Sequence, residues 1–175
     1  MAAVKYVRKK EPTLPVLALG VSLGGAAALI AGRSLDADML ILESVYSNIN
    51  QAVRNRLNMR VPNSGVLAPL LLAQLQPRIG IAPEKLSPLA AAENVSIPVL
   101  VMSGSLDLHT RSWETRAIYD AVPGEKTLHF FEGAAHQNLE RFDTEVYRSV
   151  VTRFVCSNLA WLLRTRCVAQ PSHCE

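Results

Sequence analysis

The residues Gly20-Val21-Ser22-Leu23-Gly24 place a serine between two glycines in a G-x-S-x-G pattern. An apolar, strand-like run precedes this pattern, and an alanine-rich, helix-like run follows it. A sharp strand-to-helix turn of this kind holds its serine in a strained conformation with the hydroxyl exposed. Glycines at positions 20 and 24 are expected to remove collisions between this turn and the neighbouring backbone. Ser22 is therefore a candidate nucleophile for an acyl-transfer reaction.

The same turn is expected to direct the N-terminus of the following helix toward the serine. The first N–H groups of a helix have no acceptor within the helix, so they are free to donate elsewhere. The N–H of Leu23 is thus expected to donate to the oxyanion that develops when Ser22 attacks a carbonyl carbon. The alternative is that the turn only joins two buried elements and that Ser22 has no chemical role.

A serine hydroxyl needs a base to accept its proton, and that base needs an acid to orient it. Asp107 follows the apolar run 98–103, and His136 follows the run 127–132. Because the carboxyl ends of parallel strands meet at one edge of a sheet, residues far apart in the sequence come together there. The sequence therefore predicts a catalytic triad of Ser22, Asp107 and His136.

Other side chains compete for the role of the acid. Asp107 also fits a turn or a helix cap before Thr110, since aspartate is common at both positions. Glu43 ends the apolar run 39–43 and is the alternative acid.

Three further histidines compete with His136 for the role of the base. His109 lies two residues after Asp107 and is expected at the same edge of the sheet, the rim of the site, where it is a possible substrate contact. His129 falls within a predicted strand and His173 in the C-terminal tail, so both are expected to be ordinary surface or core residues.

Alternating strands and helices must position these residues, and this alternation predicts an α/β fold with a parallel sheet. We expect one domain over residues 1–175, with a helical, lid-like insertion over residues 45–96 that several prolines interrupt. The predicted strands are 16–19, 39–43, 98–103 and 127–132. The predicted helices are 2–9, 23–33, 48–59, 66–75, 111–122 and 144–164.

The segments GVSLGG, PVLVMSGSLD, TLHFFEGAAH and VYRSVVTRF resemble the C-terminal half of serine hydrolases of the α/β hydrolase superfamily. The chain is most similar to the bacterial esterase and serine-aminopeptidase-like group, over about residues 2–163. This resemblance implies hydrolysis of a small acyl ester or a short peptide through an acyl-enzyme. It implies no metal and no organic cofactor.

Hydrolases of this family carry further strands before the nucleophile, and a loop after one of them supplies a second oxyanion donor. Only a short segment precedes the first predicted strand here, so we expect the C-terminal portion of a longer enzyme. The open sheet edge that results is expected to promote self-association or to bind the missing N-terminal half. The alternative function is a non-catalytic fragment that acts by association with another chain.

The composition agrees with a single domain and excludes several classes of partner. Of 175 residues, 49% are hydrophobic, and the basic residues behind the net charge of +3 do not cluster in a way that would indicate nucleic-acid binding.

The apolar run 14–32 is long enough to span a bilayer, but its proline, serine and glycines favour a buried strand followed by a helix. Three cysteines without C-x-x-C spacing, and the lack of a signal-like N-terminus, favour a cytoplasmic location.

Overall fold

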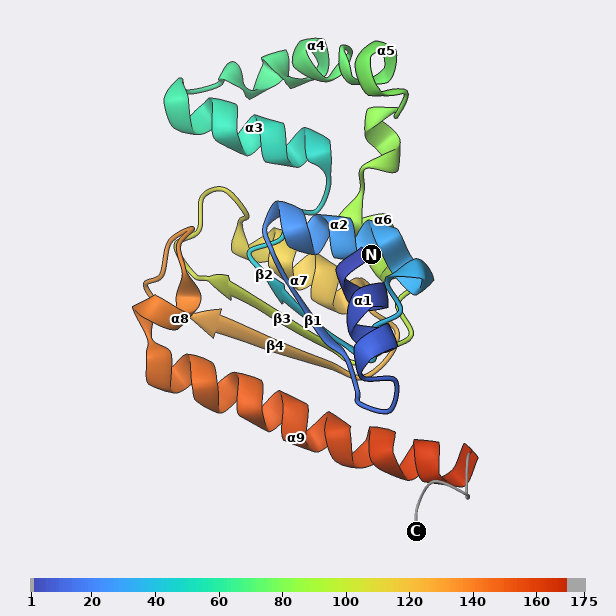
Figure 1. The fold of residues 1–175 in the computed structure, drawn as a ribbon. Coiled ribbons are helices and arrows are strands. Elements are labelled where there is room, and N and C mark those ends of the chain that lie inside the picture. Colours follow the sequence, from blue (N-terminus) through green and yellow to red (C-terminus); the bar gives the residue numbers. More distant parts are fainter. Residues whose placement is uncertain (1, 170–175) are drawn as a thin grey trace.

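A computed structural model describes residues 2–169 and contains a four-stranded parallel sheet with helices on both faces (Figure 1). The strands lie in the spatial order β1 (Leu17–Val21), β2 (Met39–Glu43), β3 (Val99–Gly104) and β4 (Lys126–Phe131). The helices are α1 (Ala2–Lys10), α2 (Leu23–Ala31), α3 (Ile49–Arg60), α4 (Ala68–Leu72), α5 (Leu75–Ile79), α6 (Pro88–Ala92), α7 (Ser112–Ala121), α8 (Leu139–Phe142) and α9 (Thr144–Ala169). Short 3-10 helices occupy Gly32–Leu35, Ser64–Leu67 and Pro83–Lys85. The predicted parallel α/β fold is confirmed.

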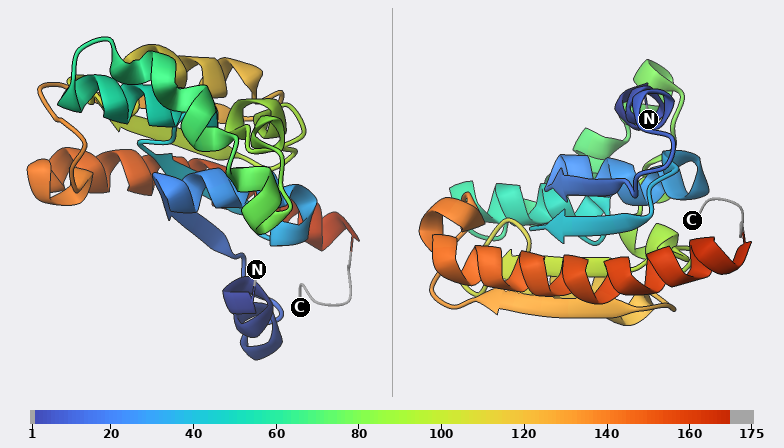
Figure 2. Two further views of the ribbon diagram at one scale, coloured as in Figure 1. Left: turned by 90° about the horizontal axis from the view of Figure 1, so that it is seen from above. Right: turned by 60° about the horizontal axis from the view of Figure 1, so that its bottom comes forward.

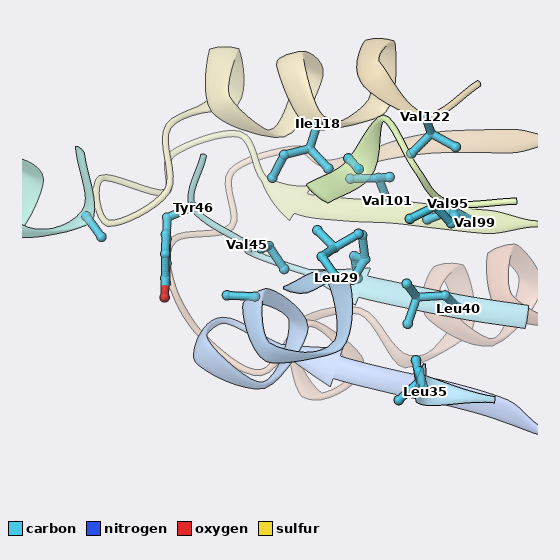
Figure 3. Close-up of a cluster of buried hydrophobic side chains, with 14 residues drawn as sticks. Leu29, Leu35, Leu40, Val45, Tyr46, Val95, Val99, Val101, Ile118 and Val122 are labelled. Atoms are coloured by element: carbon cyan, nitrogen blue, oxygen red, sulfur yellow. The ribbon is translucent and has the colours of Figure 1, made fainter. Parts of the chain in front are cut away.

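Alternate residues of the two central strands pack into two separate cores. Leu40 and Leu42 of β2 face a cluster with α2, α6 and α7, whose members include Leu29, Val101 and Ile118 (Figure 3). Met39 and Ile41 face the opposite cluster, which α9 covers along the length of the sheet (Figure 2). Every residue of β2 and β3 is buried, which explains why these runs are apolar throughout rather than alternating.

Strand β1 forms one edge of the described sheet and is much more exposed than β2 and β3. Its residues Leu17, Leu19 and Val21 lie on the same sheet face as Met39 and Ile41, since they pair in register with β2. The side chain of Leu19 is nevertheless 51% exposed. The apolar run 14–32 therefore folds as an edge strand and a helix, with apolar surface left uncovered beside it.

Within the helical insertion between β2 and β3, one predicted helix is divided in two. Residues 66–75 were expected to form one helix, but α4 ends at Leu72 and α5 begins at Leu75. Pro77 explains the break because it has no N–H to donate to the carbonyl of Ala73 and its ring crowds that carbonyl. The end of the segment 45–96 also packs with the main body, since Ala92 and Val95 belong to the core beside α2 and α7.

Candidate active site

Ser22 lies at the junction of β1 and α2, where the chain turns sharply. Its backbone has φ 48° and ψ −111°, a left-handed conformation that costs a residue with a side chain about 1–3 kcal/mol. The N–H of Ser22 still donates to the Glu43 carbonyl at 2.8 Å, so the sheet bonding continues up to the serine itself. The Ser22 side chain does not cap α2. This conformation is the strained turn that the sequence pattern predicts.

Two glycines allow the strand and the helix to approach each other at this turn. A Cβ atom at Gly20 would lie 2.5 Å from the Cα of Gly25, and one at Gly25 would lie 2.8 Å from the Gly20 carbonyl oxygen. A Cβ atom at Gly24, in contrast, would meet nothing within 4 Å. The expectation that Gly24 relieves a collision is therefore wrong, because the first turn of α2 directs this position away from β1. Gly25 has that role, and the G-x-S-x-G pattern alone does not single it out.

Leu23 is the first residue of α2, so its N–H has no acceptor within the helix. It follows Ser22 directly and stands at the positive end of the helix dipole. This is the position predicted for a donor to an oxyanion.

Asp107 and His136 are brought together by the loops that follow β3 and β4. The carboxylate Oδ2 of Asp107 lies 2.7 Å from Nδ1 of His136. The same carboxylate accepts the backbone N–H groups of His109 at 2.8 Å and Thr110 at 2.9 Å, and the Thr110 hydroxyl at 2.7 Å. The Asp107 side chain is fully buried, while His136 is partly exposed. The carboxylate is thus fixed in place and leaves Nε2 of His136 free to face a substrate or a serine.

The pKa of Asp107 reflects this environment. Burial alone would raise the pKa of the carboxyl, but hydrogen bonds from His136 and Thr110 and the charge of His136 outweigh burial and lower the pKa below 3.8. Asp107 is therefore a carboxylate at neutral pH. An ionised carboxylate at Nδ1 keeps the proton on that nitrogen and stabilises an imidazolium ring.

Glu43, the alternative acid, has a different partner. The Tyr147 hydroxyl of α9 donates to Oε1 of Glu43 at 2.5 Å. Burial raises the pKa of Glu43, and the bond from Tyr147 only partly opposes that rise. Since Asp107 occupies Nδ1 of His136, Glu43 lies outside the hydrogen bond that orients this histidine.

Between Ser22 and His136, both within the described part of the chain, no hydrogen bond is formed. Such contacts are often long in unliganded enzymes and tighten when a substrate binds. The structure thus joins the candidate acid and the candidate base by a hydrogen bond, and Ser22 follows the carboxyl end of β1 in the same parallel sheet.

Gly104, at the end of β3, allows the His136 loop to cross close to the Asp107 loop. A Cβ atom there would lie 2.2 Å from the carbonyl oxygen of Ala134, which also accepts the Leu106 N–H at 2.9 Å. Sequence reasoning did not select Gly104, although a glycine between a buried strand and a candidate acid is a signal of such a crossing.

His109 stacks on the candidate base. The ring centroids of His109 and His136 lie 4.6 Å apart with 35° between the ring planes. Nδ1 of His109 is buried and has no hydrogen-bond partner in the described structure. His109 therefore lies at the rim, as predicted, and packs against His136. Of the other histidines, His129 lies in β4 against the edge of Phe131, and His173 is outside the described residues.

We expect the pKa of His109 to lie below 6.5, so that this ring is neutral at pH 7 and gains a proton only in more acidic solution. Burial lowers the pKa most, and the positive charges of His136 and Arg56 lower it further, against an opposing effect of Asp107. An NMR titration of the imidazole protons measures this value. Arg56→Gln should raise the midpoint, and Arg148→Gln on α9 should not change it. A midpoint at or above 6.5 in the unmodified protein would contradict this assignment.

Glu114 connects the helical insertion to the loop that carries Asp107. This carboxylate of α7 is completely buried, and its Oε2 accepts the N–H and the hydroxyl of Ser47 at 3.0 and 2.9 Å. Its Oε1 accepts the Asn55 amide at 2.6 Å and the Arg111 N–H at 3.2 Å. The same Asn55 amide also donates to the His109 carbonyl at 3.0 Å. Helix α3 is therefore tied to the segment that holds Asp107 and His109.

Glu114→Ala is expected to lower the free energy of unfolding by about 3 kcal/mol or more, because it leaves buried donors of Ser47 and Asn55 without an acceptor. Urea denaturation followed by circular dichroism measures the change. Glu84→Ala, which removes an exposed carboxylate of the insertion, is the control and should leave stability nearly unchanged. A loss below about 1 kcal/mol for Glu114→Ala would show that the network adds little.

A parallel sheet between two helical layers, with a strained serine at a strand-to-helix turn, is the fold of the α/β hydrolases. No protein-family model matches the chain. The uncharacterised protein YqkD of Bacillus subtilis is 28% identical over 141 residues, which cover 78% of this chain and 46% of YqkD.

Solved α/β hydrolases have the same fold at low sequence identity. The esterase Pf2001 of Pyrococcus furiosus matches with a TM-score of 0.65 and 16% identity, over 89% of this chain and 59% of the esterase. The butyrate-bound esterase Est2 of Thermogutta terrifontis matches with a TM-score of 0.64 and 20% identity, over 89% of this chain and 63% of the esterase. A monoacylglycerol lipase of Paleococcus ferrophilus matches with a TM-score of 0.55 and 18% identity, over 88% of this chain and 74% of the lipase. The chain thus spans less than half of YqkD and about three fifths of the two esterases.

Proposed function

We propose that this chain carries the catalytic residues of a serine hydrolase that cleaves an ester or amide bond through an acyl-enzyme. The observation that carries the proposal is the 2.7 Å contact between Asp107 Oδ2 and His136 Nδ1, after the carboxyl ends of β3 and β4. Strand β1 of the same parallel sheet leads into the strained Ser22. The esterases and the lipase among the solved structures of the same fold support this choice of chemistry.

In the proposed reaction, the Ser22 hydroxyl oxygen forms a bond to the acyl carbonyl carbon while Nε2 of His136 takes the hydroxyl proton. The carbonyl oxygen becomes an oxyanion that accepts the Leu23 N–H. His136 then returns its proton to the leaving alcohol or amine, and the acyl group remains on Ser22. Water repeats the two steps, with His136 again as the base, and releases the acid. Asp107 accepts a hydrogen bond from the Nδ1–H of His136 throughout.

We further propose that full activity depends on a polypeptide that completes the sheet beside β1, either a second copy of this chain or an N-terminal half. Leu19 and Val21 are exposed there, and an uncovered apolar edge strand is a template for pairing. A second oxyanion donor would come from that polypeptide, and one such donor is worth about 3 kcal/mol of transition-state stabilisation.

Labelling with a fluorophosphonate probe tests the proposed function. We expect the phosphorus atom to bond to the Ser22 oxygen, with loss of fluoride, and peptide mass spectrometry to locate the adduct on that residue. Ser22→Ala should abolish labelling, while the control Ser157→Ala, which changes an exposed serine on α9, should retain it. A folded chain that never labels would instead favour the non-catalytic alternative.

A further inference from the structure

Most of the helical insertion carries positive charge without acidic residues, and its two glutamates, Glu84 and Glu93, lie near its C-terminal end. Residues 44–83 contain no aspartate or glutamate, and they contain the arginines Arg54, Arg56, Arg60 and Arg78. None of these four forms an ion pair with another described residue. Arg54 and Arg56 donate only to neutral oxygens of their own helix, one turn away. Residues 44–83 therefore have a formal charge of +4, carried by arginines on either side of the uncharged stretch 61–77.

The same segment exposes large apolar side chains. Helix α4 buries Ala68 and Leu72, but Leu70 is 71% exposed and Leu71 is 46% exposed. Val66, just before this helix, is 74% exposed. Further exposed apolar residues of the segment are Met59, Val61, Leu67, Ile79 and Ile81. We call the exposed apolar residues of 59–81, together with the four arginines, the insertion surface.

The insertion surface belongs to a layer that stands outside the sheet and its two helical faces. Figure 1 shows α3, α4 and α5 beyond α2 and α6, so that one side of this layer faces away from the body of the protein. Exposed apolar residues that gather on one segment are a frequent feature of interaction sites. The patch contains no acidic residue, which makes it complementary to a partner that is both apolar and negatively charged.

No described helix is long and apolar enough to cross a membrane by itself. A bent pair, Ser64–Ile79 with Pro83–Ala92, has sufficient length and hydropathy, but its two parts meet at 90°. Ala68 and Leu72 in the first part and Pro88 and Ala92 in the second are buried within the protein. These contacts favour a position at a membrane interface over a span.

We propose that the insertion surface docks onto the surface of an anionic phospholipid bilayer. Leucines and valines of α4 and its flanks would enter the boundary between headgroups and acyl chains, where apolar area is removed from water. The arginines would lie among the phosphate and carboxylate groups of the lipids, and each basic residue near such a surface strengthens binding about fivefold.

Docking would also hold the proposed active site near the membrane, on the far side of the helical insertion. Helix α3 is connected to the catalytic loop through the bond from Asn55 to the His109 carbonyl at 3.0 Å. This consequence rests on the proposed function, whereas docking itself does not. Acyl esters held in a membrane would then be the proposed substrate class.

Co-sedimentation with vesicles tests the proposal without an activity measurement. The full chain should bind vesicles of phosphatidylcholine mixed with phosphatidylserine at least about tenfold more tightly than vesicles of phosphatidylcholine alone. High salt should remove most of this preference, because it screens the charges. Ser22→Ala should bind as the unmodified chain does, so failure of docking is distinguishable from failure of the proposed chemistry.

Two pairs of substitutions locate the binding surface. Leu70→Gln with Leu71→Gln, and separately Arg60→Gln with Arg78→Gln, should each weaken binding to the anionic vesicles about tenfold or more. The matched control is Val146→Gln with Arg148→Gln on α9, which also changes exposed residues and should bind normally. Thermal melting of each variant by circular dichroism verifies that the fold is retained.

Two results would overturn the proposal. One is equal binding to neutral and anionic vesicles, or no binding to either. The other is that the chain forms oligomers and does not bind vesicles, and that Leu70→Gln with Leu71→Gln makes it monomeric. The insertion surface would then be a contact between copies of the protein.

Discussion

Asp107→Asn is expected to lower kcat for an ester substrate by about 10⁴-fold. The Asp107 carboxylate lies 2.7 Å from Nδ1 of His136 and is ionised at neutral pH. An asparagine offers either a neutral oxygen or an N–H at that place, so it no longer favours the proton on Nδ1 and does not stabilise the imidazolium ring. KM should change little, because the carboxylate is buried and is not expected to touch the substrate.

Glu43→Gln is the matched control for Asp107→Asn. It also removes a buried carboxyl charge near a strand end, but this carboxyl is bonded to Tyr147. The variant should keep kcat within about threefold of the unmodified protein, since small losses of this size follow from minor repacking. The assignment of the acid would be wrong if Asp107→Asn kept its activity while Glu43→Gln lost it.

Gly20→Ala is expected to lower the free energy of unfolding by about 3 kcal/mol or more. The added methyl group would lie 2.5 Å from the Cα and 2.7 Å from the N of Gly25, and both are backbone atoms that cannot rotate away. Helix α2 would have to shift from β1, which would also move Ser22 and the Leu23 N–H. Urea denaturation measures the loss.

Gly24→Ala provides the control at the same turn. Its added methyl group would meet nothing within 4 Å, and an alanine within a helix is favoured over glycine by about 1 kcal/mol. The variant should therefore be as stable as the unmodified protein or slightly more stable. Equal losses for Gly20→Ala and Gly24→Ala would mean that the close approach of β1 and α2 does not limit this turn.

The strands and the order of the candidate triad could be predicted because each depends on a short, local pattern. Strand β2 has the predicted bounds, since a continuous apolar run between polar residues fits a strand that is buried on both faces. Asp107 and His136 were predicted to meet because parallel strands bring their carboxyl ends to one edge, and they do meet through the bond at Nδ1.

The contacts that surround these residues could not be predicted, because they join elements that are distant in the sequence. The carboxylate of Glu114 in α7 accepts from Asn55 in α3, 59 residues earlier, and nothing near either residue indicates the other. Glu43 meets Tyr147 across 104 residues. The mistaken role of Gly24 has a similar cause, since the crowding of Gly25 by Val45 depends on how α2 crosses the sheet.

The hydrolysis of p-nitrophenyl acetate by the unmodified chain and by Ser22→Ala shows whether Ser22 is the nucleophile. We expect measurable turnover in the unmodified chain, alone or with the polypeptide that completes its sheet, and a loss of about 10⁴-fold or more in Ser22→Ala. Equal rates of hydrolysis by the two folded proteins would contradict it.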